Sequence, residues 1–212
     1  MQRYFVGITG ASGHCYARAL VRALLAAGCG VDVSVTGAGL KVLRHEEGID
    51  GDDPVQRAAW LGAGAERVRW FDSDAVEAPA ASGTALLRGV LLCPASVGTC
   101  ARVAAGFSSN LLERAADVAL KEGRALLVVP RETPLSELHL ENLLKLARLG
   151  AIVLPAAPGF YHRPATIEDL VEHVVGKILD RLDVPHALGA RWSGLSEPPA
   201  ESGALSLRGR AP

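Results

Sequence analysis

Short apolar runs alternate with longer segments of helical period along most of the chain. The runs Tyr4 to Thr9 and Val31 to Thr36 have the composition of strands. They are followed by Cys15 to Ala27 and by Ala38 to His45, in which apolar residues recur at helical spacing. This alternation predicts βαβ units and therefore a parallel sheet with right-handed crossovers.

The same rhythm continues to Leu182. The continuous apolar run Gly89 to Cys93 is typical of a strand buried on both faces. The remaining predicted strands are Val68 to Phe71, Ala125 to Val129 and Ala151 to Leu154, and the remaining predicted helices are Ser96 to Ala105, Asn110 to Glu122, Leu138 to Leu149 and Ile167 to Leu182. We expect six strands and about six helices in a three-layer, doubly wound α/β fold of the flavodoxin or Rossmann type.

Two segments lack a helical period and predict loops, Glu47 to Gln56 and Ser73 to Thr84. After Trp192 the chain is rich in Gly, Ser and Pro and too poor in large apolar residues to form a core. We therefore expect one domain over residues 1–192 and a tail over 193–212, flexible or ordered only against a neighbouring subunit.

Charge and cysteine content narrow the function classes. A formal net charge of -1 provides no general basic field for nucleic acid or an anionic membrane, so an anion must be recognised at a local site. No apolar stretch approaches the ~20 residues that span a bilayer, which predicts a cytoplasmic protein without a membrane partner. Buried, reduced thiols without zinc-site spacing are expected at Cys15, Cys29, Cys93 and Cys100.

The first candidate site is the glycine-rich segment Gly7 to Gly13, where a strand ends and a helix begins. Backbone N–H groups and the helix dipole favour a phosphate at such a junction, although the segment also suits a plain tight connection. A nicotinamide site would instead need GxGxxG and an acidic residue near the end of the second strand. Here the spacing is GxxGxxG and that strand ends in Thr36, with Asp32 in its interior, which argues against NAD.

Two further strand ends carry polar groups. After the buried strand, Ser96 is a candidate N-cap and Thr99 offers a hydroxyl, which suits either a second anion or ring-edge site or simple capping. Arg131 and Glu132 follow another central strand, at the edge where open α/β sheets bind ligands. Arg can hold phosphate bidentately and Glu can accept a proton, whereas a surface ion pair is the alternative.

Two groups of residues lie further along the chain. Arg114, Asp117 and Lys121 share one helix face, which predicts a salt-bridge stripe unless the fold aims Lys121 at a pocket. In the aromatic segment Pro158 to Pro164, Tyr161 can donate to a phosphate or face an allylic cation. An aromatic plug at the sheet edge is the other interpretation.

Taken in order, these motifs resemble the UbiX flavin prenyltransferases from about residue 3 to residue 193. The matching segments are GITGASG, HE near the end of the second βα unit, CPASVGT, NLLERAADVALKE, VPRETP, HLENLLKLARLGAIVLPAAPGFYHRP and the terminal ARW. The resemblance implies a flavodoxin-like, homo-oligomeric fold, typically a dodecamer, with FMN at subunit contacts.

The resemblance also implies the residues of the site. FMN would be bound by Gly10, Ala11, Ser12, Thr36, Ser96, Val97, Gly98, Thr99, Arg114 and Arg131. The prenyl donor, dimethylallyl phosphate or its diphosphate, would be bound by Tyr161, Lys177, Lys121 and Arg131. The implied catalytic set is Ser12, Glu46, Lys121, Arg131, Glu132, Tyr161 and Lys177.

The activity implied is transfer of a dimethylallyl group to N5 and C6 of reduced FMN, which makes prenylated FMN for a partner decarboxylase. The chain has no DDxxD box, so we expect metal-independent chemistry with Ser12 and Glu132 handling protons. It departs from the family pattern at Thr36-Gly37, where Ser-Lys is expected, and at Lys177, where Arg is expected. Lys keeps the charge but gives up bidentate geometry.

Two other functions share parts of this pattern. An FMN-dependent cysteine-type decarboxylase would need a PxMNxxMW-like clamp, yet the only Met is residue 1. A non-catalytic FMN carrier would need the loops at Ser12 and Ser96, but not Lys121, Tyr161 and Lys177 together.

Overall fold

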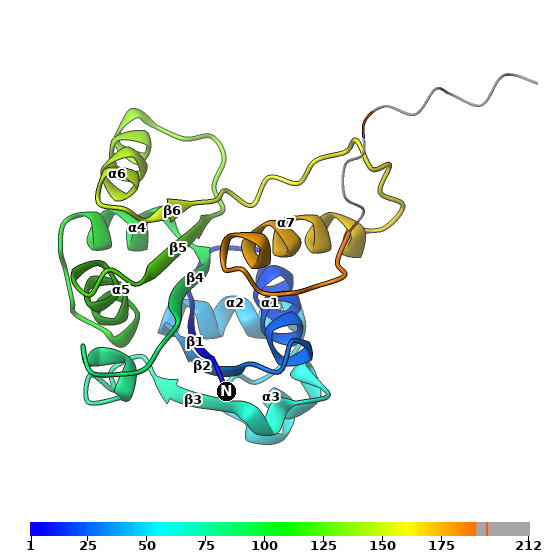
Figure 1. The fold of residues 1–212 in the computed structure, drawn as a ribbon, viewed down its shortest axis with the longest axis horizontal. Coiled ribbons are helices and arrows are strands. Elements are labelled where there is room, and N and C mark those ends of the chain that lie inside the picture. Colours follow the sequence, from blue (N-terminus) through cyan, green and yellow to red (C-terminus); the bar gives the residue numbers. More distant parts are fainter. Residues whose placement is uncertain (190–193, 195–212) are drawn as a thin grey trace, which may run out of the picture.

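A parallel six-stranded sheet forms the centre of the molecule (Figure 1). The computed structural model describes residues 1–189 and Gly194, so the expected domain boundary at residue 192 lies outside the described residues. The strands, in the spatial order β3-β2-β1-β4-β5-β6, are β1 (Arg3–Ile8), β2 (Gly30–Val35), β3 (Val68–Asp72), β4 (Gly89–Ala95), β5 (Ala125–Pro130) and β6 (Ile152–Val153).

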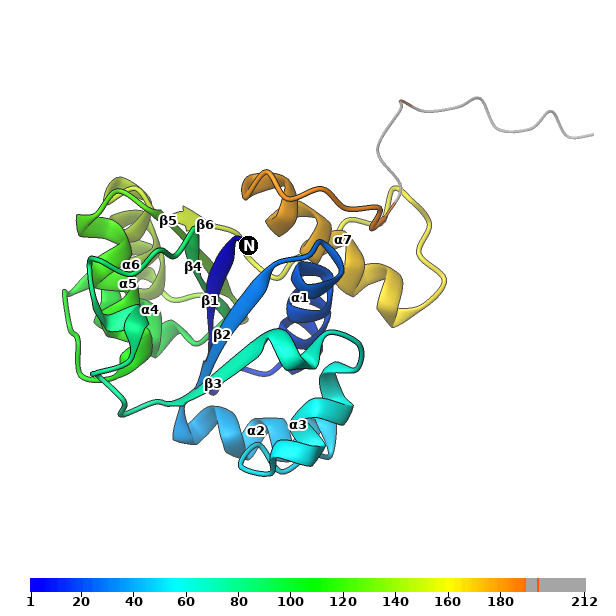
Figure 2. The same cartoon turned by 60° about the horizontal axis from the view of Figure 1, so that its bottom comes forward.

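Helices cover both faces of this sheet (Figures 1 and 2). One face carries α1 (His14–Ala26), α2 (Gly37–Glu47), α3 (Pro54–Leu61) and α7 (Ile167–Arg181). The other carries α4 (Val97–Ala104), α5 (Leu111–Lys121) and α6 (Glu137–Arg148). The predicted three-layer, doubly wound fold is confirmed.

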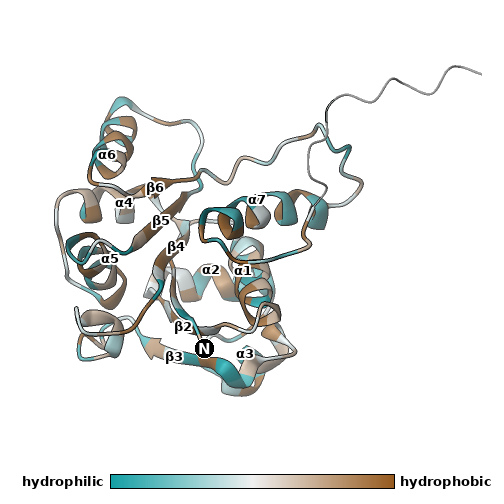
Figure 3. Ribbon diagram, in the orientation of Figure 1, coloured by the Kyte–Doolittle hydropathy of each residue, from teal (hydrophilic) through white to brown (hydrophobic). Residues whose placement is uncertain are grey.

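The two cores follow from the alternation of side chains along each strand. In β1, Tyr4, Val6 and Ile8 point into the core beneath α1 and α7, whereas Phe5 points into the core beneath α5. Both sets are fully buried, as expected of a parallel strand covered on both faces. Figure 3 shows the resulting apolar colouring of the central strands.

The predicted loop from Glu47 to Gln56 is wrong at both of its ends. Glu47 is the last residue of α2, and α3 begins at Pro54. The Asp53 side chain accepts hydrogen bonds from the backbone N–H of Val55 at 2.8 Å and of Gln56 at 3.3 Å. Asp followed by Pro is an N-cap and N1 signal, which the surrounding Gly and Asp residues obscured.

The other loop and the cysteines agree with expectation more closely. The segment from Ser73 to Thr84 contains one 3-10 turn, η2 (Pro79–Ala81), and a second such turn, η1 (Ala65–Arg67), precedes β3. Three of the four free thiols are buried and Cys15 is half-buried. Burial raises the pKa of Cys100 to about 12. Among the described helices none is long and apolar enough to cross a bilayer.

Asp32 is a buried ion-pair partner. Its carboxylate accepts from Arg3 Nη1 at 2.8 Å and from Arg69 Nε and Nη2 at 2.8 and 2.6 Å. The side chain is completely buried. Asp32 therefore neutralises two arginines across β1, β2 and β3 and is not placed to hold a ribose.

Gly7 allows α5 to approach the sheet. A Cβ at this position would lie 2.8 Å from the Cδ2 atoms of both Leu112 and Leu92. We predict that Gly7→Ala overpacks this contact, costs about 1–3 kcal/mol and lowers the melting temperature by roughly 3–10 °C. Gly37→Ala is the matched control, because a Cβ there meets nothing within 4 Å. Equal melting temperatures for both variants would contradict this account of Gly7.

Candidate functional site

The candidate site lies at the carboxyl ends of β1 and β4. These two strands are neighbours, yet β1 leads into α1 on one face and β4 leads into α4 on the other. Such a switch in direction opens a crevice outside the strand ends, which is where ligands bind in open α/β sheets. The strand order therefore identifies the region before any side chain is considered.

Thr9 ties the two diverging strand ends together. Its hydroxyl donates to the carbonyl of Pro94 at 2.9 Å and accepts from the backbone N–H of Ser96 at 2.7 Å. Its own backbone N–H also donates to Pro94 at 3.2 Å. Thr9 is buried, and its role could not be predicted from the sequence because a Thr at a strand end is common.

The ends of the neighbouring strands β2 and β5 are hydrogen-bonded to the ends of β1 and β4. The backbone N–H of Thr36 donates to the carbonyl of Ile8 at 3.0 Å. Arg131 donates from its backbone to the carbonyl of Ala95 at 3.3 Å and from Nε to the carbonyl of Ser12 at 2.9 Å. The carboxyl ends of four strands are therefore joined around the loop Gly10, Ala11 and Ser12. This loop lies between the end of β2 and the Arg131 guanidinium.

Glu46 occupies the N-terminus of α1. Its Oε2 accepts from the backbone N–H groups of Gly13 at 2.8 Å and His14 at 3.0 Å. Partial burial works to raise the pKa of Glu46, but hydrogen bonds from the Ser12 side chain and from these two amides outweigh it, so the pKa is lowered. The amides of Gly13, the last residue of the segment predicted to bind phosphate, and of His14 therefore already face an internal carboxylate.

The starts of α2 and α4 are capped but sterically open. Thr36 Oγ1 accepts from the N–H of Gly39 at 3.1 Å, and Ser96 Oγ accepts from that of Thr99 at 3.2 Å. A Cβ added at Gly37 or at Gly98 would meet no atom within 4 Å. The N-cap predicted at Ser96 is confirmed, and Val97, Gly98 and Thr99 form the first turn of α4.

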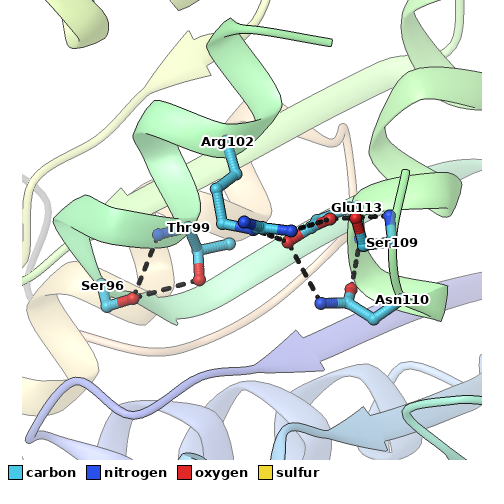
Figure 4. A network of polar contacts seen from close by, with 6 residues as sticks. All are labelled: Ser96, Thr99, Arg102, Ser109, Asn110 and Glu113. Carbon is cyan, nitrogen blue, oxygen red and sulfur yellow. Dashed lines mark hydrogen bonds and ion pairs between the residues drawn. The ribbon is translucent and has the colours of Figure 1, made fainter. Parts of the chain in front are cut away.

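A network around the buried Glu113 carboxylate joins α4 to the start of α5 (Figure 4). The Glu113 carboxylate, 1% exposed, accepts from Arg102 Nε at 2.5 Å, the N–H of Ser109 at 2.8 Å and Asn110 Nδ2 at 3.1 Å. Burial acts to raise the pKa of Glu113, and these donors lower it further than burial raises it. The network fixes α4 against the start of α5, a role that sequence reasoning missed.

His14 is a second residue that the sequence analysis passed over. It is fully buried, and its Nε2 lies 3.0 Å from the carbonyl oxygen of Thr9. Burial lowers the pKa of His14, so the ring is neutral near pH 7 and donates from Nε2. This bond joins the first residue of α1 to the end of β1.

Tyr161 and Lys177 belong to a different part of the chain. The segment between β6 and α7 runs alongside α7 (Figure 1), and within it Tyr161 contacts His173 of that helix. Lys177 lies one turn beyond His173, exposed, and both line a pocket of about 430 Å³ with Leu154 and Pro155. Tyr161 is 46% exposed and packs on His173, so the plug at the sheet edge is not formed.

The remaining predicted residues are distributed as follows. Arg114 Nε donates to the carbonyl of Ala81 at 3.2 Å, and Arg114 pairs with Asp117 as the helix spacing predicted. Lys121 pairs with Glu122 at the end of α5, which leads into the start of β5. Lys121 therefore lies at the amino-terminal end of the strands, opposite the candidate site. Glu132 is exposed beside Arg131 and accepts from the N–H of Thr133 at 3.0 Å, so the two do not form the alternative ion pair.

The fold agrees with comparisons to known proteins. Residues 1–179 match the family model described as Flavoprotein. A curated relative from Halalkalibacterium halodurans, named flavin prenyltransferase UbiX, is 48% identical over 190 residues, covering 89% of this chain and 92% of the relative. The chain belongs to the UbiX family of flavin prenyltransferases.

Solved structures of UbiX-type proteins have the same fold. AnUbiX (PadA1), solved with FMN and dimethylallyl pyrophosphate, superposes with a TM-score of 0.83 at 32% identity, covering 92% of this chain and 99% of that one. A dodecameric FMN-dependent UbiX-like decarboxylase from Escherichia coli O157:H7 gives 0.82 at 34% identity, covering 91% and 100%. The suspected family membership is confirmed.

The Glu46 contact predicts a specific acid sensitivity. Its folded pKa lies below the ordinary value of 4.5, so its stabilisation is present above about pH 4.5 and is lost as pH falls through the folded pKa. We expect Glu46→Gln to lose about 1–2 kcal/mol of stability at pH 7 and to show a shallower decline in acid. Melting temperatures from pH 7 to pH 3, with the exposed Glu77→Gln as control, measure this. A parallel shift at every pH would contradict the ionic role.

Proposed function

We propose that this chain transfers a dimethylallyl group from dimethylallyl phosphate to N5 and C6 of reduced FMN, making prenylated FMN. The observation that supports this most is the set of hydrogen bonds that joins the carboxyl ends of β1, β2, β4 and β5. These ends combine a small-residue loop, two open helix starts and the Arg131 guanidinium. Backbone amides at helix starts and a guanidinium suit the phosphate of a flavin mononucleotide.

The residues present fit FMN. Gly10, Ala11 and Ser12 carry no bulky side chains, and Ser12 is exposed. The first turns of α2 and α4 supply further backbone N–H groups at neighbouring strand ends. Arg131 is the cation of this group. Because Glu46 occupies the Gly13 and His14 amides, we assign the FMN phosphate to the residues around Thr36 and Arg131 instead.

Cationic side chains promote departure of the donor's phosphate. When the allylic C–O bond breaks, negative charge grows on the leaving oxygen, and prearranged cations lower that barrier. Lys121, Arg131 and Lys177 are the cations that we assign to this task. We assign the Tyr161 ring, 46% exposed, to the allylic carbons, since aromatic faces attract cations.

Proton transfer is assigned to Ser12 and Glu132, with Glu46 in support. The pKa of Glu46 is lowered by the hydrogen bonds that outweigh its burial, and one of these comes from the Ser12 side chain. Ser12 therefore donates to Glu46 and turns its oxygen lone pairs outward as an acceptor. Reduced FMN supplies N5 and C6 as the nucleophiles, and the released phosphate is a further base.

Neighbouring copies complete the site in this proposal. Lys121 and Arg131 lie at opposite ends of the strands, so one chain does not bring the two together. Large exposed apolar side chains on α6 offer a subunit contact, namely Leu138, Leu140 and Leu144 at 63, 53 and 50% exposure. We infer a homo-oligomer, a dodecamer as in the Escherichia coli neighbour, with a cytoplasmic prenylated-FMN-dependent decarboxylase as recipient of the product.

A single-turnover assay tests the activity. Purified protein is mixed anaerobically with reduced FMN and dimethylallyl phosphate in the presence of EDTA, and the molecular mass of the extracted flavin is measured by mass spectrometry. We expect a gain of one C5H8 unit. Unmodified FMN with both the phosphate and the diphosphate donor would refute the prenyltransferase and favour the carrier or decarboxylase.

Glu132 provides the sharpest residue-level test of the chemistry. We predict that Glu132→Gln slows single-turnover prenylation by about 100-fold, the lower range for loss of a general acid–base group, while FMN still binds. Rapid-quench kinetics and an FMN titration measure the two effects. Glu137→Gln, an exposed carboxylate at the start of α6, is the control. An unchanged rate would remove Glu132 from the mechanism.

A further inference from the structure

His173 makes contacts that set the geometry of Tyr161. Its Nδ1 lies 3.2 Å from the backbone nitrogen of Gly159, and its Nε2 lies 2.9 Å from the hydroxyl oxygen of Tyr161. The His162 ring stacks on it with centroids 5.1 Å apart and an interplanar angle of 7°. Both ends of the imidazole are therefore engaged and its plane is held.

The hydrogen bonds determine the tautomer. The N–H of Gly159 can only donate, so Nδ1 must present its lone pair and the proton of the neutral ring must lie on Nε2. Nε2 therefore donates to the Tyr161 oxygen. Tyr161 accepts in this bond, and its own hydroxyl hydrogen is directed to an acceptor other than His173.

The loop backbone is shaped around this contact. A Cβ on Gly159 would lie 2.8 Å from Cε1 of Tyr161 and 3.3 Å from Cε1 of His173. Glycine therefore lets the main chain come close enough for its N–H to reach Nδ1. Among the described residues the buried His162 ring nitrogens have no hydrogen-bond partner, and the ring serves as a packing surface for His173.

Neighbouring groups keep the imidazole neutral. Burial lowers the pKa of His173, and electrostatic interaction with His162 and Lys177 lowers it further. Tyr161, His162 and Lys177 are the titratable groups that face the ring from the loop and from α7. The single-proton tautomer of His173 is therefore the form present near pH 7.

We propose that His173 is a positioning residue that makes Tyr161 a hydrogen-bond donor to the phosphate of the prenyl donor, beside Lys177. This inference rests on the proposed function and adds a residue to it. In this arrangement the Nε2–H of His173 occupies a lone pair of the Tyr161 oxygen, so the hydroxyl hydrogen turns towards the anion. Tyr161 and Lys177 then approach the phosphate as a donor pair, which offsets the bidentate geometry that Lys lacks.

Two substitutions separate the contacts of His173. Asn places an oxygen near Nδ1, so His173→Asn keeps the bond from Gly159 and loses the one to Tyr161. Gln places its amide near Nε2, so His173→Gln keeps a donor to Tyr161. Calorimetry measures binding of dimethylallyl monophosphate to protein loaded with oxidised FMN, in which no transfer occurs.

We expect His173→Asn to weaken donor binding about fivefold, the typical effect of one hydrogen bond, and His173→Gln to stay within about twofold of wild type. FMN affinity and melting temperature should be unchanged in both. In a Tyr161→Phe background, His173→Asn should have no further effect, because it acts through the missing hydroxyl. Equal losses in the two backgrounds, or wild-type binding by His173→Asn, would overturn the inference.

The outcome also separates this inference from the proposed function. If the wild-type chain binds dimethylallyl monophosphate and prenylates FMN while His173→Asn binds the donor normally, only the role of His173 is refuted. If the wild-type chain neither binds the donor nor modifies FMN, the proposed function fails and the role of His173 fails with it.

Discussion

The buried hydroxyl of Thr9 is the contact on which the site depends. Two adjacent strands separate here towards opposite faces of the sheet, and backbone pairing alone does not hold their ends together. The hydroxyl spans the gap by donating to Pro94 and accepting from Ser96. The glycine-rich loop and the first turn of α4 are fixed relative to each other by these two bonds, and Arg131 adds the third side through Ser12.

Charge is divided between two regions of the chain. At the carboxyl ends of the strands, Glu46 accepts from the amides at the start of α1, and Arg131 is the cation that we assign to the flavin. Along α7, Lys177 lies beside a neutral histidine and a tyrosine, a combination suited to a phosphate that must be bound and then released. In the proposed function, assembly of several copies brings these regions and Lys121 to one active site.

Local pattern in the sequence predicted the elements well. The first strand and helix begin within a residue of the expected positions, because burial on both faces of β1 and the helical period of α1 are short-range signals. The helix α3 was missed since Asp53-Pro54 lies among loop-forming residues. The strand order was not predicted, because it depends on which strands pair far apart in the sequence.

The site residues divide in the same way. Ser96 was readable as an N-cap because the signal lies within three residues. The contacts of Thr9, Glu46 and His173 join positions that are distant in the sequence or separated by a loop, so a single sequence offers no period or spacing to find them. The roles of Tyr161 and Lys177 came from the family resemblance and stay predictions.

The Thr9 contact is tested most directly by the dissociation constant of FMN for two near-isosteric variants, Thr9→Val and Thr9→Ser. Valine keeps the shape and removes the hydroxyl, whereas serine keeps the hydroxyl. We predict at least tenfold weaker binding for Thr9→Val, about 1.4 kcal/mol, and binding within about twofold of wild type for Thr9→Ser. A folded Thr9→Val protein that binds FMN as tightly as wild type would contradict it.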